Sequence, residues 1–222
     1  MKIPFTKYGL PQVLVFPAVI LMVMVIAGMT LSEWVLWTVQ GLLFAVLVWV
    51  LAFFRDPERK VPQDRNILLS PADGLISDIE AVDEETVIGG KALRIGIFLN
   101  VFNVHINRTP CAVRIDNITY RKGEFRNALD PESARVNESN DVAMTRLDSP
   151  ADKLLVRQIS GAIARRIVCA AKPEQEFSGG ERFGMIKFGS RTELYLPFRE
   201  DLKPVVKIGD KVKAGLTVFI KY

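Results

Sequence analysis

The single histidine of the chain, His105, is the side chain best suited to proton transfer at neutral pH. It lies in the segment NVFNVHINRTP, which reads as a strand. On a strand, His105 would share one face with Asn103 and Asn107, because successive side chains point to opposite faces. Such a polar face either meets solvent or lines a wet cavity, and the sequence leaves both alternatives open.

The pair Gly189-Ser190 stands between two apolar runs of the sequence. The first run ends at Phe188, and the second, from Thr192 to Leu196, alternates with the period of a strand. Glycine and serine commonly punctuate chains, so the pair on its own predicts a loop. A serine hydroxyl can also act as a nucleophile, although the sequence contains no GxSxG elbow.

Asp73 offers a carboxylate in the segment SPADG. Asp-Gly is a common hairpin-turn pair, so a turn between the neighbouring apolar runs is the ordinary explanation. A catalytic carboxylate is the alternative, and this segment alone favours the turn.

Composition disfavours several other kinds of site. Cys111 and Cys169 lie far apart without CxxC spacing, so we expect reduced, buried thiols and no metal site. The net charge of +4 is modest, and no pattern of aromatic and basic residues favours nucleic acid. The slight excess of Lys and Arg instead suits a surface that contacts anionic lipid headgroups.

Two long apolar segments precede all of these residues. Neither Pro11–Thr30 nor Trp34–Phe54 contains a charged residue, and each is about as long as the roughly 20 residues that a helix needs to cross a bilayer. The connector LSE between them is short enough to predict a tight helical hairpin. A cleaved signal peptide fits less well, because the second apolar segment follows almost at once.

Basic residues flank this hairpin at both ends: Lys2, Lys7, Arg55, Arg59 and Lys60. A hairpin places both of its ends on one side of the membrane, and the positive-inside rule assigns that side to the cytoplasm. We therefore expect the protein at the cell membrane, with everything after Arg55 on the cytoplasmic side.

The remainder of the chain predicts a β-rich domain, because short alternating runs are separated by glycine turns. The expected fold class is α+β, mostly β. Residues 1–60 would form the membrane hairpin and its exit linker, and residues 61–222 a β-rich domain with a barrel-sandwich-like C-terminal part. The polar stretch 124–144 is expected as a surface loop, and 158–172 as either a short helix or a strand pair.

Several motifs together resemble those of one family. FFRDPER follows the hairpin, SPADG and FLNVFNVHINRTP contain Asp73 and His105, and NALDPES, NESN, ISGAIARRIVC, GERFGMIKFGSRTELYLP and GDKVKAG follow in that order. In this order and spacing, over nearly the whole chain, they resemble the phosphatidylserine decarboxylases, specifically the short type of bacteria and archaea.

The resemblance implies a chain that cleaves itself between Gly189 and Ser190. In that family the serine hydroxyl attacks the glycine carbonyl to give an ester, elimination gives dehydroalanine, and loss of ammonia leaves a pyruvoyl group. The catalytic domain, residues 61–222, would then contain a large chain ending at Gly189 and a small chain starting at position 190. The pyruvoyl ketone would form a Schiff base with phosphatidylserine and accept electrons as carbon dioxide leaves, giving phosphatidylethanolamine without an external cofactor.

The resemblance also bears on Asp73 and His105. In longer relatives, an Asp in the motif corresponding to PADG and a second histidine assist self-cleavage, but Arg108 stands where that histidine would fall. Either His105 serves both self-cleavage and decarboxylation, or Asp73 and backbone groups promote cleavage while His105 handles protons during decarboxylation. We favour the second alternative.

The implied partners are phosphatidylserine and the surrounding membrane lipid, and a homo-oligomer is left open. Arg165 and Arg166 are candidates to meet the lipid phosphate, or to serve exposed or structural roles. Archaetidylserine, an archaeal ether lipid, is an alternative substrate. A non-catalytic, membrane-anchored module related to biotinyl or lipoyl carriers is an alternative of another class, and an ordinary serine hydrolase is a third. Both of these would leave the chain in one piece.

Overall fold

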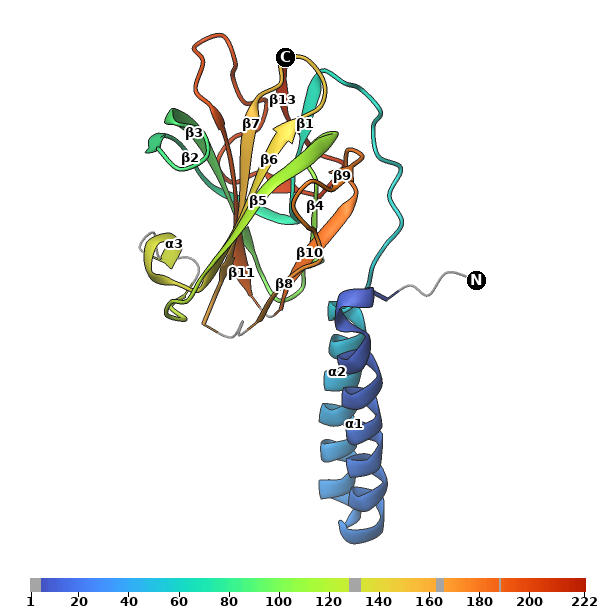
Figure 1. Cartoon of the computed structure of the whole chain (residues 1–222). Helices are drawn as coiled ribbons and strands as arrows, with labels where there is room; N and C mark the ends of the chain where they lie inside the picture. The colour runs from blue at the N-terminus through green and yellow to red at the C-terminus, as the bar shows by residue number, and fades with distance from the viewer. Residues whose placement is uncertain (1–4, 128–132, 163–165, 188) are drawn as a thin grey trace. The chain divides into compact units, whose positions relative to one another are not determined.

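The computed structural model describes residues 5–127, 133–162, 166–187 and 189–222; Lys2, Arg165 and Phe188 lie outside these ranges. The chain divides into two compact units, Met1–Glu58 and Arg59–Tyr222. The first contains the long helices and the second contains the strands (Figure 1). The predicted fold class, α+β and mostly β with two N-terminal helices, is confirmed.

The first unit is a helical hairpin. A short 3₁₀ helix, Lys7–Gly9, leads into α1, Leu10–Thr30, and α2 follows at Glu33–Phe53. The Gln40 side chain of α2 donates a hydrogen bond to the Met24 carbonyl of α1 over 2.8 Å, which ties the two helices together. Both helices are apolar on all sides, and both are long and apolar enough to cross a membrane.

In the described residues of the second unit there are thirteen strands and one short helix. They are β1 (Ile67–Leu69), β2 (Gly74–Glu84), β3 (Gly90–Leu99), β4 (Ile106–Arg108), β5 (Val113–Arg121), α3 (Ser133–Val136), β6 (Ser139–Arg146), β7 (Lys153–Ser160), β8 (Arg166–Cys169), β9 (Glu176–Phe177), β10 (Arg182–Lys187), β11 (Ser190–Pro197), β12 (Lys211–Val212) and β13 (Val218–Lys221).

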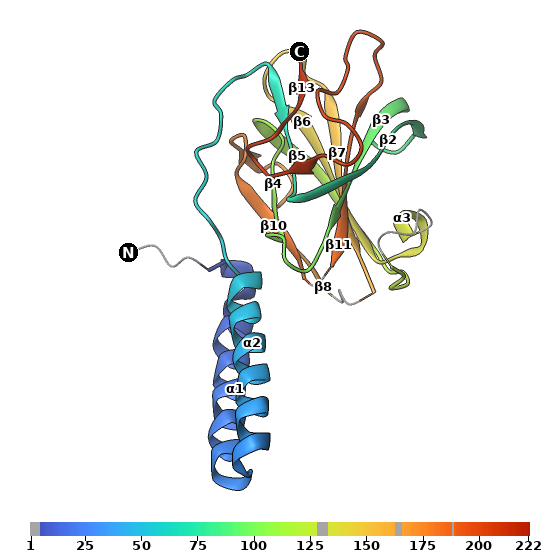
Figure 2. The ribbon, with the colours of Figure 1, turned by 180° about the vertical axis from the view of Figure 1, so that it is seen from behind.

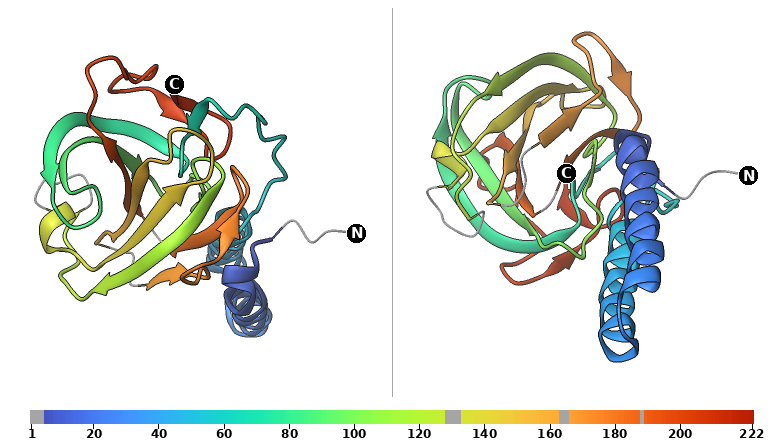
Figure 3. Two further views of the ribbon diagram at one scale, coloured as in Figure 1. Left: turned by 45° about the horizontal axis from the view of Figure 1, so that its top comes forward. Right: turned by 90° about the horizontal axis from the view of Figure 1, so that it is seen from below.

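The strands form three antiparallel sheets. The largest has the order β12-β2-β3-β11-β7-β6-β5-β9, a smaller one has the order β4-β10-β8, and β1 pairs with β13. Viewed towards one end, the large sheet curls around the interior (Figure 3). Figure 2 shows β4 and β10 beside each other on the opposite side from β2 and β3.

The core follows from alternation along the central strands. Ile95 and Ile97 of β3 and Leu194 and Leu196 of β11 are fully buried in one apolar cluster, to which β1, β10 and β13 also contribute side chains. The residues between them point to the other face of the large sheet. β11 therefore has an inner face that is apolar from Leu194 onwards and a polar outer face, and both faces are buried.

One end of this domain brings the candidate residues together. Only residues 188 and 189 separate the end of β10 from the start of β11. Since β4 is antiparallel to β10, both β4 and β11 begin at this end. We call it the Ser190 end; the last residues of β3 and β7 also lie here, because Ser190 pairs with Leu99 and Ser160.

The structure corrects the expectation for His105. β4 begins at Ile106, so His105 immediately precedes the strand, and the residues from Val104 to Pro110 are all buried. The polar side that His105 would share with Asn107 therefore does not meet solvent, which was one of the two alternatives. Both sides of this segment are covered, because it lies between β10 and the inner face of the large sheet, where the Asn107 side chain reaches β11.

Two further expectations differ from the structure. Asp73-Gly74 does not join paired strands, because β1 pairs with β13 while β2 pairs with β3 and β12. Stretch 124–144 is not a surface loop throughout, since its second half contains α3 and most of β6. For 158–172, the described residues contain the end of β7 and the whole of β8, and no helix.

Candidate active site

Gly189 and Ser190 have unlike surroundings. Gly189 has φ +67°, in the left-handed region that favours glycine, and among the described residues a Cβ there would have only Val101 Cγ1 within 4 Å, at 3.9 Å. Ser190 is fully buried as the first residue of β11. Its Oγ is buried and makes no hydrogen bond with any residue that the structure describes. A buried nucleophile is thus available next to an unusual backbone conformation.

His105 contacts this peptide directly. Its Nε2 accepts a hydrogen bond from the Gly189 N–H over 3.3 Å, and its Nδ1 lies 3.0 Å from the Asn103 carbonyl oxygen. A carbonyl oxygen can only accept, so Nδ1 must carry the proton and Nε2 the lone pair. The fully buried ring is therefore neutral in this arrangement, with its basic nitrogen towards the peptide unit before Ser190.

Register explains why His105 lies beside the peptide unit that precedes Ser190. The Asn107 side chain donates to Thr192 Oγ1 over 3.0 Å, so the inner face of β11 faces β4 at this level. His105 and Ser190 stand two residues before Asn107 and Thr192, on two segments that begin at the same end. In extended chain, residues two apart point to the same side. His105 and Ser190 therefore lie on the sides of the two segments that face each other, two residues nearer to the Ser190 end than Asn107 and Thr192.

A buried row of amides continues from this contact. Gln158 Nε2 of β7 donates to Asn107 Oδ1 over 2.8 Å, and Asn140 Nδ2 of β6 donates to Gln158 Oε1 over 3.0 Å. Each polar group has a partner, which makes their burial tolerable. Sequence reasoning missed Gln158 and Asn140; the only available signal was that Asn140 lies in the NESN motif.

Asp73 is held by an ion pair at the Ser190 end. Its two carboxylate oxygens accept from Arg59 over 2.6 and 2.7 Å, and Oδ1 also accepts from the Ala214 N–H over 2.8 Å. The segment just before it adjoins β4, because the Arg108 N–H donates to the Pro71 carbonyl over 2.9 Å. β3 lies between β2 and β11, so Asp73 and Ser190 are roughly 10 Å apart, two strand spacings. The carboxylate makes no hydrogen bond to Ser190.

Arg108 and Arg166 have different environments. Arg108, which stands where longer relatives would have a second histidine, is buried and donates to the Gly180 carbonyl over 2.9 Å. Arg166, the first residue of β8, is exposed and pairs in register with Lys187. Burial first, and then the positive charge of Arg166, lower the pKa of Lys187.

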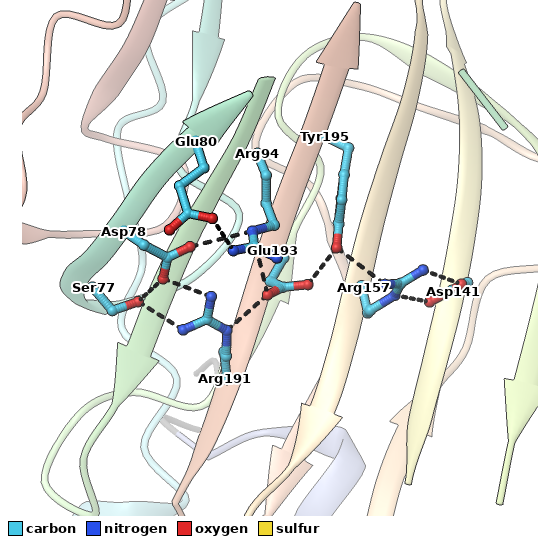
Figure 4. A network of polar contacts seen from close by, with 9 residues as sticks. All are labelled: Ser77, Asp78, Glu80, Arg94, Asp141, Arg157, Arg191, Glu193 and Tyr195. Carbon is cyan, nitrogen blue, oxygen red and sulfur yellow. Dashed lines mark hydrogen bonds and ion pairs between the residues drawn. The ribbon is translucent and has the colours of Figure 1, made fainter. Parts of the chain in front are cut away.

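The residue after Ser190 anchors β11 through its outer face (Figure 4). The Arg191 guanidinium donates to Ser77 Oγ over 2.9 Å, to Asp78 Oδ2 over 2.6 Å and to Glu193 Oε1 over 2.8 Å. Gly96 of β3 makes room for this, because a Cβ there would overlap both the Arg191 and Asp78 side chains. A shift of register between Ile76 and Asp78 accompanies this arrangement on β2.

The network extends across five strands. Arg94 lies 3.3 Å from Asp78 and 3.9 Å from Glu193, and Tyr195 donates to Glu193 Oε2 over 2.6 Å. Arg157 then joins Tyr195 to Asp141. Burial alone would raise the pKa of the Asp78 carboxyl, but Arg191, Ser77 and Arg94 together lower it below its ordinary value. The backbone directly after Ser190 is thereby fixed by charge-assisted contacts.

The chain is similar to known proteins over most of its length. Residues 46–220 match the family model described as phosphatidylserine decarboxylase. A phosphatidylserine decarboxylase proenzyme of Rhodopirellula baltica is 43% identical over 221 residues, covering 100% of this chain and 89% of the relative. Proteins of the same name from Desulfotalea psychrophila and Pelagibacter ubique are 47% identical over 170 residues and 43% over 196, covering 77% and 86% of this chain and 78% and 89% of theirs. The chain therefore belongs to the phosphatidylserine decarboxylase family of carboxy-lyases.

Proposed function

We propose that this chain decarboxylates phosphatidylserine to phosphatidylethanolamine, using a pyruvoyl group that it makes from Ser190. The observation that carries the proposal is the buried Ser190 hydroxyl, which has no partner among the described residues and follows a glycine in left-handed backbone. Leaving such a hydroxyl unpaired costs about 1–3 kcal/mol, which favours a chemical use for it. Relatives named as proenzymes support self-cleavage as that use.

Self-cleavage needs only groups of this chain and one water molecule. Ser190 Oγ attacks the Gly189 carbonyl carbon, the C–N bond breaks as the ester forms, and the hydroxyl proton passes to the nitrogen. Removal of the Ser190 Cα proton then breaks the Cβ–O bond, and that oxygen stays with Gly189 as a carboxylate. Water replaces the nitrogen at Cα, ammonia leaves, and the small chain begins with a pyruvoyl group.

The surroundings of Ser190 fit this group, because they are enclosed and contain one neutral imidazole. The ketone supplies an electrophile for a primary amine and an electron sink for the loss of carbon dioxide. His105 moves protons at Nε2, where it now accepts from the Gly189 N–H. After cleavage Gly189 is a chain end, so this hydrogen bond can be given up and Nε2 becomes available.

We assign Asp73 to self-cleavage, through positioning. It holds Arg59 and the turn at Ala214, and the segment before it lies against β4, which follows His105. Direct proton transfer would require the carboxylate to leave Arg59, whose side chain is only 5% exposed in this pair. The backbone around Gly189 lies nearer than Asp73 to the carbonyl that Ser190 attacks, so we assign the promotion of this attack to the backbone.

The apolar hairpin favours membrane association. We place the hairpin and its exit linker at residues 1–60 and the catalytic domain at residues 61–222, on the cytoplasmic side. Anchoring at the surface lets the site receive a headgroup while the acyl chains stay in their leaflet. Protease or thiol reagents added outside intact cells should leave the domain after Arg55 untouched, and labelling of that domain would reject this orientation.

Mass spectrometry of the intact purified protein tests the central proposal. The wild type should be two chains that separate on a denaturing gel, and the small chain should carry a carbonyl that reacts with hydroxylamine. Ser190→Ala should fold, remain one chain and lack decarboxylase activity, because no oxygen can attack Gly189. Ser139→Ala, another buried serine of the same domain, is the matched control and should still be cut. Wild-type protein that is active while uncut would reject the mechanism.

A further inference from the structure

The turn between β3 and His105 presents an aromatic side chain to the outside. Phe102 is 71% exposed at the tip of the segment Asn100–Asn103, which we call the Phe102 loop. Three of the four backbone N–H groups of the loop are hydrogen-bonded within it. The Asn103 N–H donates to the Asn100 carbonyl over 3.0 Å, the Asn100 N–H to Asn103 Oδ1 over 2.9 Å, and the Phe102 N–H to Asn100 Oδ1 over 2.9 Å.

This hydrogen bonding determines whether the loop can enter an apolar environment. An amide moved into an apolar phase without a partner costs several kcal/mol, on the order of 2–7. In the Phe102 loop, two asparagine side chains turn back onto the backbone, so three of its N–H groups already have partners. The loop can therefore enter a medium without water while its most exposed side chain gains from leaving water.

The position of the loop distinguishes Phe102 from a scattered surface residue. Its neighbour Val101 is the nearest side chain to the space above Gly189, and Asn103 provides the carbonyl that holds His105 Nδ1. The loop thus borders the proposed active site and also orients its histidine. A single exposed aromatic residue would otherwise need no explanation.

Charge at the same end favours a lipid surface as the partner. Lys122 directly follows β5, and Arg166 begins β8; both are exposed. The pairing of β5, β6, β7 and β11 places Lys122 at the Ser190 end, and Arg166 pairs with Lys187 there. Each such cation near an anionic lipid surface contributes about 1 kcal/mol. An apolar tip with exposed cations at the same end of the domain suits a bilayer better than an acidic protein surface.

We propose that the Phe102 loop inserts Phe102 into the lipid surface and so sets the active site against the bilayer from which it takes its substrate. This inference rests on the proposed function, because it assigns the way in which the same site meets phosphatidylserine. It differs from anchoring by the apolar hairpin, which holds the protein at the membrane without fixing how the site faces it.

The chain offers a matched control at the other end of β11. Phe198 directly follows that strand, is 42% exposed, and is fixed by a hydrogen bond from its N–H to the Lys91 carbonyl. Because Ser190 begins β11 and Phe198 follows its last residue, the two aromatic residues lie at opposite ends of the domain. Phe198→Ser removes a similar exposed ring without touching the proposed surface.

The experiment compares one enzyme on two forms of one substrate. Full-length wild type, Phe102→Ser, Phe102→Leu and Phe198→Ser are assayed on phosphatidylserine in vesicles and on dispersed short-chain phosphatidylserine, with rates normalised to the amount of cut chain. We expect Phe102→Ser to lose on the order of tenfold or more on vesicles and to keep its rate on the dispersed lipid. Phe102→Leu and Phe198→Ser should keep both rates.

The outcomes separate the two proposals. Equal loss on both substrates would mean that Phe102 acts only through the site, and no loss on vesicles would mean that it meets no lipid; either overturns the inference. A wild type that is inactive on both substrates would instead reject the proposed function. If Phe102→Ser is not cut, a fluorophore on Phe102→Cys, with Cys111 and Cys169 replaced by alanine, gives a second measurement. Spin-labelled lipids should quench it and should not quench the same label on Phe198→Cys; equal quenching overturns the inference.

Discussion

Removing the Arg191 guanidinium should destabilise the catalytic domain far more than removing an exposed arginine. Arg191→Met keeps the length of the side chain but takes the charged partner from Asp78 and Glu193, whose side chains are 17% and 0% exposed. Their remaining cation is Arg94, at 3.3 and 3.9 Å. The buried carboxylate of Glu193 and the partly buried carboxylate of Asp78 would then share one arginine.

The magnitude follows from these contacts. Breaking a buried ion pair by removing one partner costs about 3–5 kcal/mol, and the presence of Arg94 places the loss near the lower limit, about 3 kcal/mol. A change of 1 kcal/mol shifts the melting temperature of a domain of this size by about 2–4 °C. Arg191→Met should therefore melt about 6–12 °C below its parent.

The comparison is cleanest in the Ser190→Ala background, where every variant is one uncut chain. Far-ultraviolet circular dichroism in detergent is the suitable signal, because all three tryptophans lie in α2 and would not report on the sheet. Arg114→Met is the control: that side chain is 44% exposed and pairs with Asp116 at 3.7 Å, so its loss should cost less than about 1 kcal/mol. If both variants melt within about 2 °C of each other, the network contributes no net stability and the reasoning fails.

Other consequences of the structure can be measured in the same preparations. Because the pKa of Asp78 is lowered in the folded protein, its contribution is complete above the ordinary value of 3.8 and is lost as pH falls through the folded pKa; the difference between Arg191→Met and its parent should shrink below about pH 4. Gly96→Ala should lower the melting temperature and add little to Arg191→Met, since a Cβ at Gly96 disturbs the same pair; simple additivity would contradict this. His105→Ala should still be cut and lose decarboxylation by a factor on the order of 10² or more, whereas near-normal turnover would reject its role. Asp73→Asn should slow self-cleavage, which would be seen as full-length precursor on gels. Unchanged processing would mean that Asp73 has a structural role and does not promote self-cleavage.

The local sequence pattern was sufficient to predict the elements whose structure depends on residues close in sequence. The uncharged runs from Pro11 and from Trp34 predicted two helices, because a helix apolar on every side can be read from composition alone. The β-rich domain was predicted from short alternating runs separated by glycine turns, and one such turn, where Gly89 has φ +77°, joins β2 and β3. The motifs around Asp73, His105 and Gly189-Ser190 predicted the family, which is confirmed.

The local sequence pattern did not predict burial where it depends on strands that are distant in sequence. The sequence left open whether the polar face around His105 meets solvent, and Asn107 is in fact buried because Thr192 and Gln158 supply its partners. Stretch 124–144 looked like a loop because it is polar. Its Asn137 is buried by hydrogen bonds to Arg126 and to the Ser160 carbonyl, which no local pattern reveals.

The sequence by itself determined the residue types that could react and their order along the chain: one histidine, one Gly-Ser pair and an aspartate before a glycine. Only the tertiary structure decided their relations. It set the Gly189 N–H against His105 Nε2, left the Ser190 hydroxyl without a partner among the described residues, and committed Asp73 to Arg59. The physical reason is that hydrogen bonding and burial depend on which strands become neighbours, and β4, β10 and β11 are brought together by long-range pairing that a period of two cannot encode.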